Sequence, residues 1–309
     1  MKTLTAAASA AAFAACALAA SPGQAQQGAK MHPFILAANG PGQVARVADE
    51  VKAKLANGGF QVVGSYSPYP AVVVVAVTSD ALKTAAAQTR FGAYGAVQRI
   101  SVTQAKDQVQ IAYTNPRYMA AAYRMKGDLG AVAAGLAKVL GAEKEFGAEK
   151  EAMTDAELRK YQYMFGMEYF DDPHELARHK SYADAVAAVE KNLAAGVSGV
   201  TKVYRVDVPG KEETVFGVAM NGKKGDGDMQ DDTYLMSQID FKGVKSSAHL
   251  PYEMVVAGDT VYALSARFRI AINFPDLSMM GSNSFMSIMG SPEAIKKALT
   301  LAAGGKPAS

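Results

Sequence analysis

A stretch near the middle of the chain gathers the side chains best suited to hold a soft metal. Positions 161–179 carry tyrosines, two methionines three residues apart and two histidines. Thioether sulfur and imidazole nitrogen ligate copper, and Met and His also ligate haem iron. We therefore take Met164, Met167, His174 and His179 as candidate metal ligands, with copper or haem as the cofactor classes they fit.

The same stretch also has an interpretation without a cofactor. Thr154 followed by Glu157 is a capping box and predicts a helix start, which places Met164 and Met167 on one helical face. Pro173 interrupts that helix, and the two histidines are too far apart in spacing to share one face. Met and Tyr commonly fill gaps between packed elements, so this interpretation predicts a helical linker between two domains.

Other residues that could bind a ligand or take part in a reaction have ordinary structural explanations. A second methionine group, Met279–Met289, suits either a soft-metal loop or core packing. The acidic stretch 226–232 lacks the spacing of a calcium loop. Arg267 and Arg269 fall in a run that predicts a strand, where period two puts both on one exposed face. No serine nucleophile elbow, phosphate loop or zinc-protease motif occurs in the chain, so the sequence favours a protein that is not an enzyme.

The N-terminus has the pattern of an export signal. Lys2 precedes an apolar run that ends near Ala20, and small residues lead to Ala25. This predicts a signal peptide over residues 1–25 and a periplasmic mature protein. Cys16, the single cysteine, offers an alternative in which the chain is anchored by a lipid. The apolar run is too short for a membrane span.

Charge and composition narrow the partners. The formal net charge is only +3, and half of the residues are hydrophobic. A nucleic-acid partner usually requires a strongly basic surface, so none is expected. The mature chain is long enough for one large or two ordinary domains.

Two blocks of the chain show the same order of expected elements. Each begins with an apolar helical stripe, continues with two strands and a second helix, and closes with two further strands. The first block is expected to have helices at 44–57 and 81–88 and strands at 60–63, 72–77, 97–103 and 108–113. The second is expected to have helices at 186–193 and 231–239 and strands at 202–208, 214–220, 252–256 and 261–272. The polar stretch 221–230 accounts for the greater length of the second block.

These patterns predict an α+β protein built from two similar sheet-plus-helix repeats. The expected organisation is a flexible N-terminus at 26–42, a first repeat at 43–127, a helical linker at 128–180 and a second repeat at 181–304. Within the linker, the alternating acids and lysines of 143–151 are typical of a solvated helix face.

The strand pairs that close the two blocks resemble family 302 of the domains of unknown function. The second block carries Leu250-Pro251 before a strand, a polar turn, and a long run to Asn273-Phe274-Pro275, while the first ends at Asn115-Pro116. The resemblance implies a compact α+β fold that is often dimeric, and it implies no activity. The first block lacks the Leu-Pro pair, and Tyr252 stands where the family often has cysteine, so no thiol chemistry is carried over.

The sequence thus predicts an exported, non-catalytic binding or accessory protein. Its partner would be a small ligand or another periplasmic protein, bound in the crevice between the repeats. The alternative is a periplasmic metal or redox protein that uses the segment 161–179.

Overall fold

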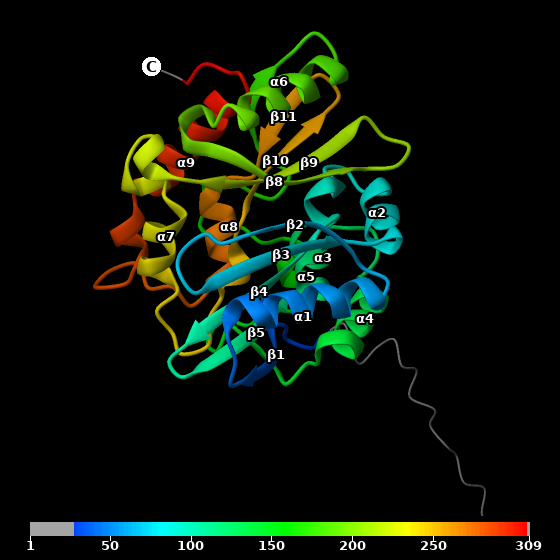
Figure 1. The fold of residues 1–309 in the computed structure, drawn as a ribbon. Helices are drawn as coiled ribbons and strands as arrows, with labels where there is room; N and C mark the ends of the chain where they lie inside the picture. The colour runs from blue at the N-terminus through cyan, green and yellow to red at the C-terminus, as the bar shows by residue number, and fades with distance from the viewer. Residues whose placement is uncertain (1–27, 308–309) are drawn as a thin grey trace, which may run out of the picture.

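The structure is a computed structural model, and it describes residues 28–307. The fold is α+β with two antiparallel sheets, as predicted (Figure 1). The first sheet has the order β2-β3-β4-β5-β1-β6 and the second the order β7-β11-β10-β9-β8. The strands of the first sheet are β1 Phe34–Gly40, β2 Gln61–Tyr66, β3 Val72–Thr78, β4 Gln98–Ala105, β5 Gln108–Thr114 and β6 Lys144–Phe146. Those of the second are β7 His174–Arg178, β8 Val200–Asp207, β9 Glu213–Met220, β10 Tyr252–Ala257 and β11 Thr260–Ala263.

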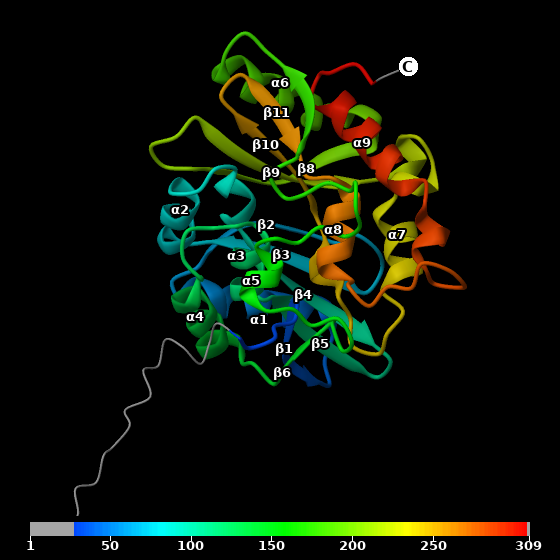
Figure 2. The same ribbon diagram turned by 180° about the vertical axis from the view of Figure 1, so that it is seen from behind.

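Helices cover the sheets on their outer sides and fill the space beside them (Figures 1 and 2). The first half of the described chain has α1 Val44–Asn57, α2 Asp80–Ala87, α3 Pro116–Ala122, α4 Gly130–Leu140 and α5 Asp155–Leu158. The second half has α6 Tyr182–Ala194, α7 Asp232–Ile239, α8 Ala266–Asn273 and α9 Ser291–Ala302. Helix α1 packs against β3 and α4, whereas α6 packs against β8 and β10. None of these helices within residues 28–307 combines the length and the apolar run needed to cross a bilayer.

Several helix starts are those that the sequence predicts. Ser79 caps α2 by accepting a hydrogen bond from the Leu82 amide, and Asp231 caps α7. Both bonds of the Thr154–Glu157 capping box are formed at α5. Such caps satisfy amides that have no partner inside the helix, so a local pattern of a few residues is enough to place them.

The two halves follow the same order of elements and the same order of strands. Each runs strand, helix, two strands, helix, two strands, helix. Without its edge strand β6, the first sheet has the order β2-β3-β4-β5-β1. By their place in the element order, these strands correspond to β8, β9, β10, β11 and β7. The second sheet, counted from β8, has that same order, β8-β9-β10-β11-β7. The pairs β2–β3 and β8–β9 also both contain an irregularity, after Val62 and after Lys202.

The two sheets meet along β2 and β8 and through buried charged residues. Gly64 of β2 lies directly against the backbone of β8, where a side chain would overlap the Val203 carbonyl. Deeper in the contact, Arg99 of β4 forms an ion pair with Glu253 of β10 at 3.1 Å, and both side chains are almost fully buried. The halves are therefore joined by a packed interface that includes charge pairing.

The N-terminal segment is more ordered than predicted. The expectation of a flexible stretch at 26–42 is wrong for its second part, because Phe34–Gly40 forms β1 between β5 and β6. The flanking glycines and prolines suggested a loop, whereas pairing with the distant β5 decides the conformation. The predicted signal peptide and Cys16 lie outside the described residues.

The segment 128–180 is not a helical linker throughout. It contains α4 and the short α5, but Lys144–Phe146 forms β6 instead of a solvated helix, and His174–Arg178 forms β7 of the second sheet. Edge strands accept charged residues because one side faces water, which explains how an alternation of acids and lysines at 143–151 can pair with β1.

The predicted strand 261–272 is also wrong in its second part. Strand β11 ends at Ala263, and Ala266–Asn273 forms helix α8. The run of aromatic and aliphatic residues fits period two, but positions 267, 270, 271 and 274 equally fit a helical face. Arg267 and Arg269 consequently point in different directions: Arg269 is buried at 1% exposure, and Arg267 lies partly exposed.

Candidate functional site

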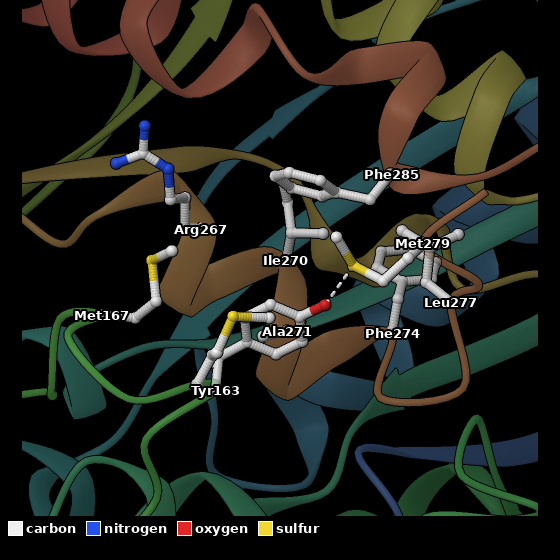
Figure 3. Close-up of a pocket in the computed structure, with 10 residues that line it drawn as sticks. Tyr163, Met167, Arg267, Ile270, Ala271, Phe274, Leu277, Met279 and Phe285 are labelled. Carbon is white, nitrogen blue, oxygen red and sulfur yellow. Dashed lines mark hydrogen bonds between the residues drawn. The ribbon is translucent and has the colours of Figure 1, made fainter.

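An apolar cavity of about 170 Å³ lies beside helix α8. Three segments that are distant in sequence form its wall: the loop between α5 and β7, helix α8, and the loop between α8 and α9 (Figure 3). The lining residues are Tyr163, Met164, Met167, Arg267, Ile270, Ala271, Phe274, Leu277, Met279 and Phe285. In Figure 3, Arg267 and Met167 lie at one end of the cavity, and Met279 and Phe285 lie at the other. We call this cavity the methionine pocket.

Helix α8 supplies one continuous face of the pocket. Residues three and four apart are neighbours on a helix surface, and Arg267, Ile270, Ala271 and Phe274 have this spacing. The other side of α8 is turned into the protein, where the Arg269 guanidinium donates to the carbonyls of Pro251 and His249. The pocket wall is thus anchored from behind by buried hydrogen bonds.

The methionine segment is a folded loop and not the helix that the sequence suggested. Helix α5 ends at Leu158. The chain then turns through Gly166, with the Met167 amide donating to the Met164 carbonyl at 3.0 Å. The positive φ of Gly166 is a conformation that glycine adopts at low cost. A hydrogen bond from the Tyr163 hydroxyl to the Met279 sulfur links this loop to the one that follows α8 (Figure 3).

Among the described residues that line the pocket, Arg267 is the one charged residue, and it is already neutralised. Arg267 forms ion pairs with Glu168 at 3.3 Å and with Glu293 at 3.1 Å. His174 lies next to this group, 3.9 Å from Glu168. Burial lowers the pKa of His174, and the positive charge of Lys296 lowers it further, so this imidazole is mostly neutral at pH 7. The residues described in its wall therefore present thioether, aromatic and aliphatic groups, together with one arginine whose charge is paired.

Among the four predicted metal ligands, two line the pocket and two do not. Met164 and Met167 are in its wall. His174 begins β7, next to Glu168 of the Arg267–Glu168 pair, and does not line the pocket. His179 follows the other end of β7, where its Nε2 contacts the Ala303 carbonyl at 3.0 Å. A strand rises ~3.3 Å per residue, so the two histidines are too far apart to share one ion.

The structure instead brings a third methionine to the first two. Met279 comes from the second methionine group of the sequence, and it lines the same pocket as Met164 and Met167. The described residues contain no group of three or more His, Cys, Asp or Glu side chains positioned to hold a metal. Both methionine groups are visible in the sequence, but no pattern in the sequence predicts that they lie together.

Two of the methionines that line the pocket are also exposed to solvent. Met164 is 46% exposed and Met279 is 42% exposed. Their neighbours in sequence are more exposed still, Phe165 at 99% and Met280 at 70%. Exposed apolar side chains beside an apolar pocket are typical of a surface that meets a ligand or partner.

Comparison of the chain with protein-family models, with curated proteins and with solved structures finds no match.

Proposed function

We propose that this chain is an exported, non-catalytic binding protein whose methionine pocket takes a small, uncharged, apolar ligand. The observation that carries the proposal is the pocket itself, about 170 Å³ in volume and walled almost entirely by apolar side chains. An apolar cavity of roughly 150 Å³ is large enough to hold benzene. Methionine adapts its shape to different ligands, so the ligand class is a single apolar ring or a chain of similar size.

The proposal also includes export of the protein, an origin by duplication and a family resemblance. The N-terminal pattern supports export, and the mass of the protein recovered from the cell envelope would decide whether residues 1–25 are removed. The matching strand orders support an ancestral duplication, which relatives with more similar halves would test. We also propose that the chain is related to family 302 of the domains of unknown function and that it forms a dimer.

Binding of toluene is the direct test. We expect toluene to shift the methyl signals of Met164, Met167 and Met279 in spectra of protein labelled at the methionine methyl groups. Ala271→Leu places extra atoms in the pocket and should weaken binding about tenfold or more, since a filled cavity loses its space for the ring. Ala53→Leu, on an exposed position of α1, is the matched control. Equal affinity of both variants, or no shift in the wild type, would refute the proposal.

A second candidate function is supported by the three thioethers. Met164, Met167 and Met279 line one cavity, and soft thioether ligands select Cu(I). Met167 and Met279 lie at opposite ends of it (Figure 3), so a shared ion requires these flexible side chains to turn toward the centre. In this alternative the protein is a metal or redox protein that uses methionines, and the two histidines take no part.

Competition with a chromophoric Cu(I) chelator separates the two candidates. If the thioethers bind Cu(I), Met279→Leu should weaken binding about tenfold or more, because a ligand atom is removed while the apolar volume is retained. Met289→Leu, an exposed methionine outside the pocket, should have no effect. Equal weak binding by both variants would exclude the metal alternative, and toluene binding is expected to survive Met279→Leu.

A further inference from the structure

The exposed methionines of residues 28–307 are confined to two loops. They are Met164, between α5 and β7, and Met279, Met280, Met286 and Met289, between α8 and α9. Both loops contribute to the wall of the methionine pocket. Five other methionines lie in the packed interior with at most 3% of their surface exposed: Met119, Met125, Met220, Met236 and Met254. The methionines that solvent reaches most easily therefore lie in the loops that build one cavity.

Met164 and Met279 combine this exposure with a place in the pocket wall. A small oxidant dissolved in water can reach their side chains directly. The packed interior has few voids larger than a water molecule, so it keeps the same oxidant away from the buried methionines. Oxidation of a methionine to its sulfoxide turns a flexible apolar side chain into a polar one. These two residues are thus the places where an oxidant can change the wall of the pocket.

A hydrogen bond at Met279 determines where an added oxygen would lie. The Tyr163 hydroxyl donates to the Met279 sulfur (Figure 3). A thioether sulfur is a weak acceptor with two lone pairs, so one pair remains for reaction. A sulfoxide oxygen is a stronger acceptor than the sulfur, and the same hydroxyl can donate to it. The added oxygen would therefore be held in the pocket wall beside Tyr163.

We propose that Met164 and Met279 are oxidation sites at which hydrogen peroxide weakens ligand binding by the methionine pocket. The sulfur attacks one oxygen of the peroxide, so a sulfur–oxygen bond forms as the oxygen–oxygen bond breaks. The proton on the transferred oxygen moves to the departing hydroxide, which leaves as water. The thioether is oxidised by two electrons to the sulfoxide, and the peroxide is reduced by the same two electrons.

The sulfoxide acts on binding through the cost of losing water. An apolar ligand binds because apolar surface is removed from contact with water. A sulfoxide oxygen in the wall loses its water when such a ligand enters, and a hydrocarbon ring offers it no hydrogen bond in return. This regulation rests on the function proposed above, because it acts on the ligand of the same pocket. Sulfoxide reductases restore the thioether, so the change is reversible.

Peptide mass mapping of the folded protein after a short exposure to hydrogen peroxide shows where oxidation occurs. We expect Met164 and Met279 to gain an oxygen at least about tenfold faster than the buried Met236 and Met254. Equal rates for the two pairs would overturn the proposal. This measurement needs no ligand, so its result is independent of whether the pocket binds toluene.

Toluene titration before and after peroxide treatment measures the effect on the pocket. We expect the affinity of the wild type to fall about tenfold or more on oxidation. Treatment with sulfoxide reductases for both sulfoxide epimers should restore it. Met164→Leu/Met279→Leu keeps apolar side chains of similar volume but has no sulfur at these sites. Whatever its affinity before treatment, that affinity should change less than about twofold on exposure to peroxide.

Met280→Leu/Met289→Leu is the matched control, because these methionines are exposed but do not line the cavity. Its toluene affinity should fall on oxidation as much as that of the wild type. An unchanged affinity in the oxidised wild type, or an equal loss in Met164→Leu/Met279→Leu, would overturn the proposal. If the reduced wild type does not bind toluene, the proposed function and the regulation that rests on it both fail. The mass map then still decides whether Met164 and Met279 are oxidation sites.

Discussion

Glu253→Gln is expected to lower the free energy of unfolding by ~3–5 kcal/mol, the range found when one partner of a buried ion pair is removed. The Glu253 carboxylate lies 3.1 Å from Arg99 and 3.4 Å from Arg269, and all three side chains are almost fully buried. It also accepts a hydrogen bond from the Tyr204 hydroxyl at 2.7 Å. Glutamine keeps the shape but removes the one negative charge that the two guanidinium groups share.

Chemical denaturation of the variant and of a surface control measures this effect. Glu190 pairs with Lys202 and Arg205 on the surface, and Glu190→Gln should cost less than ~1 kcal/mol. If Glu253→Gln is too unstable to purify, the double variant Arg99→Met/Glu253→Met should be recovered more readily, since it leaves fewer unpaired charges. A loss for Glu253→Gln no larger than that of the surface control would contradict the prediction.

The elements that were predicted correctly are those whose signals are local. Val51 and Leu55 of the apolar stripe in α1 are buried as expected and Val44 is partly buried, and the cap residues Ser79 and Asp231 start their helices. A helix of this kind is specified by neighbours three and four residues apart. The sequence does not predict strand β1, because its partner β5 is distant in the chain. No local pattern within Phe34–Gly40 indicates that pairing.

The candidate site was predicted only in part for a similar reason. Composition singled out Met164 and Met167, but Met279 joins them only because α8 holds both loops. The charge pairing of Arg99 and Glu253 has no signal in the sequence, since each residue lies in an otherwise ordinary strand pattern. The pair Asp231-Asp232 offers two residues suited to cap a helix, and the structure shows that Asp231 supplies the cap.

The contribution of Asp232 to the stability of the protein is expected to fall as the pH rises from about 4 to about 7, and Asp232→Asn should remove that contribution. Burial raises the pKa of Asp232 to about 7 in the folded state, whereas an unfolded chain has a value of ~3.9. Between these values the folded protein retains a proton that the unfolded chain has released. Unfolding therefore becomes easier as the pH increases, and the contribution is fully present below about pH 4 and lost above about pH 7.

The size of this effect follows from the difference between the two pKa values. Each unit corresponds to ~1.4 kcal/mol, so Asp232 accounts for up to ~4 kcal/mol across the range. Burial also raises the pKa of Asp240 to about 6, which adds a loss of the same sign. Burial lowers the pKa of His249 and of His174, which adds a change of the opposite sign. All three groups are present in both proteins, so the difference between the wild-type and Asp232→Asn profiles isolates Asp232.

Urea denaturation at a series of pH values provides the measurement. Asparagine has no proton to release, and its side-chain oxygen can still accept from the Met220 amide and the Tyr66 hydroxyl. We therefore expect the variant to gain stability relative to the wild type as the pH rises, with the change centred between about pH 4 and pH 7. Asp107→Asn, at an exposed turn, controls for the loss of one negative charge. Parallel profiles for the wild type and Asp232→Asn would contradict the prediction and mean that Asp232 is ionised throughout in the folded protein.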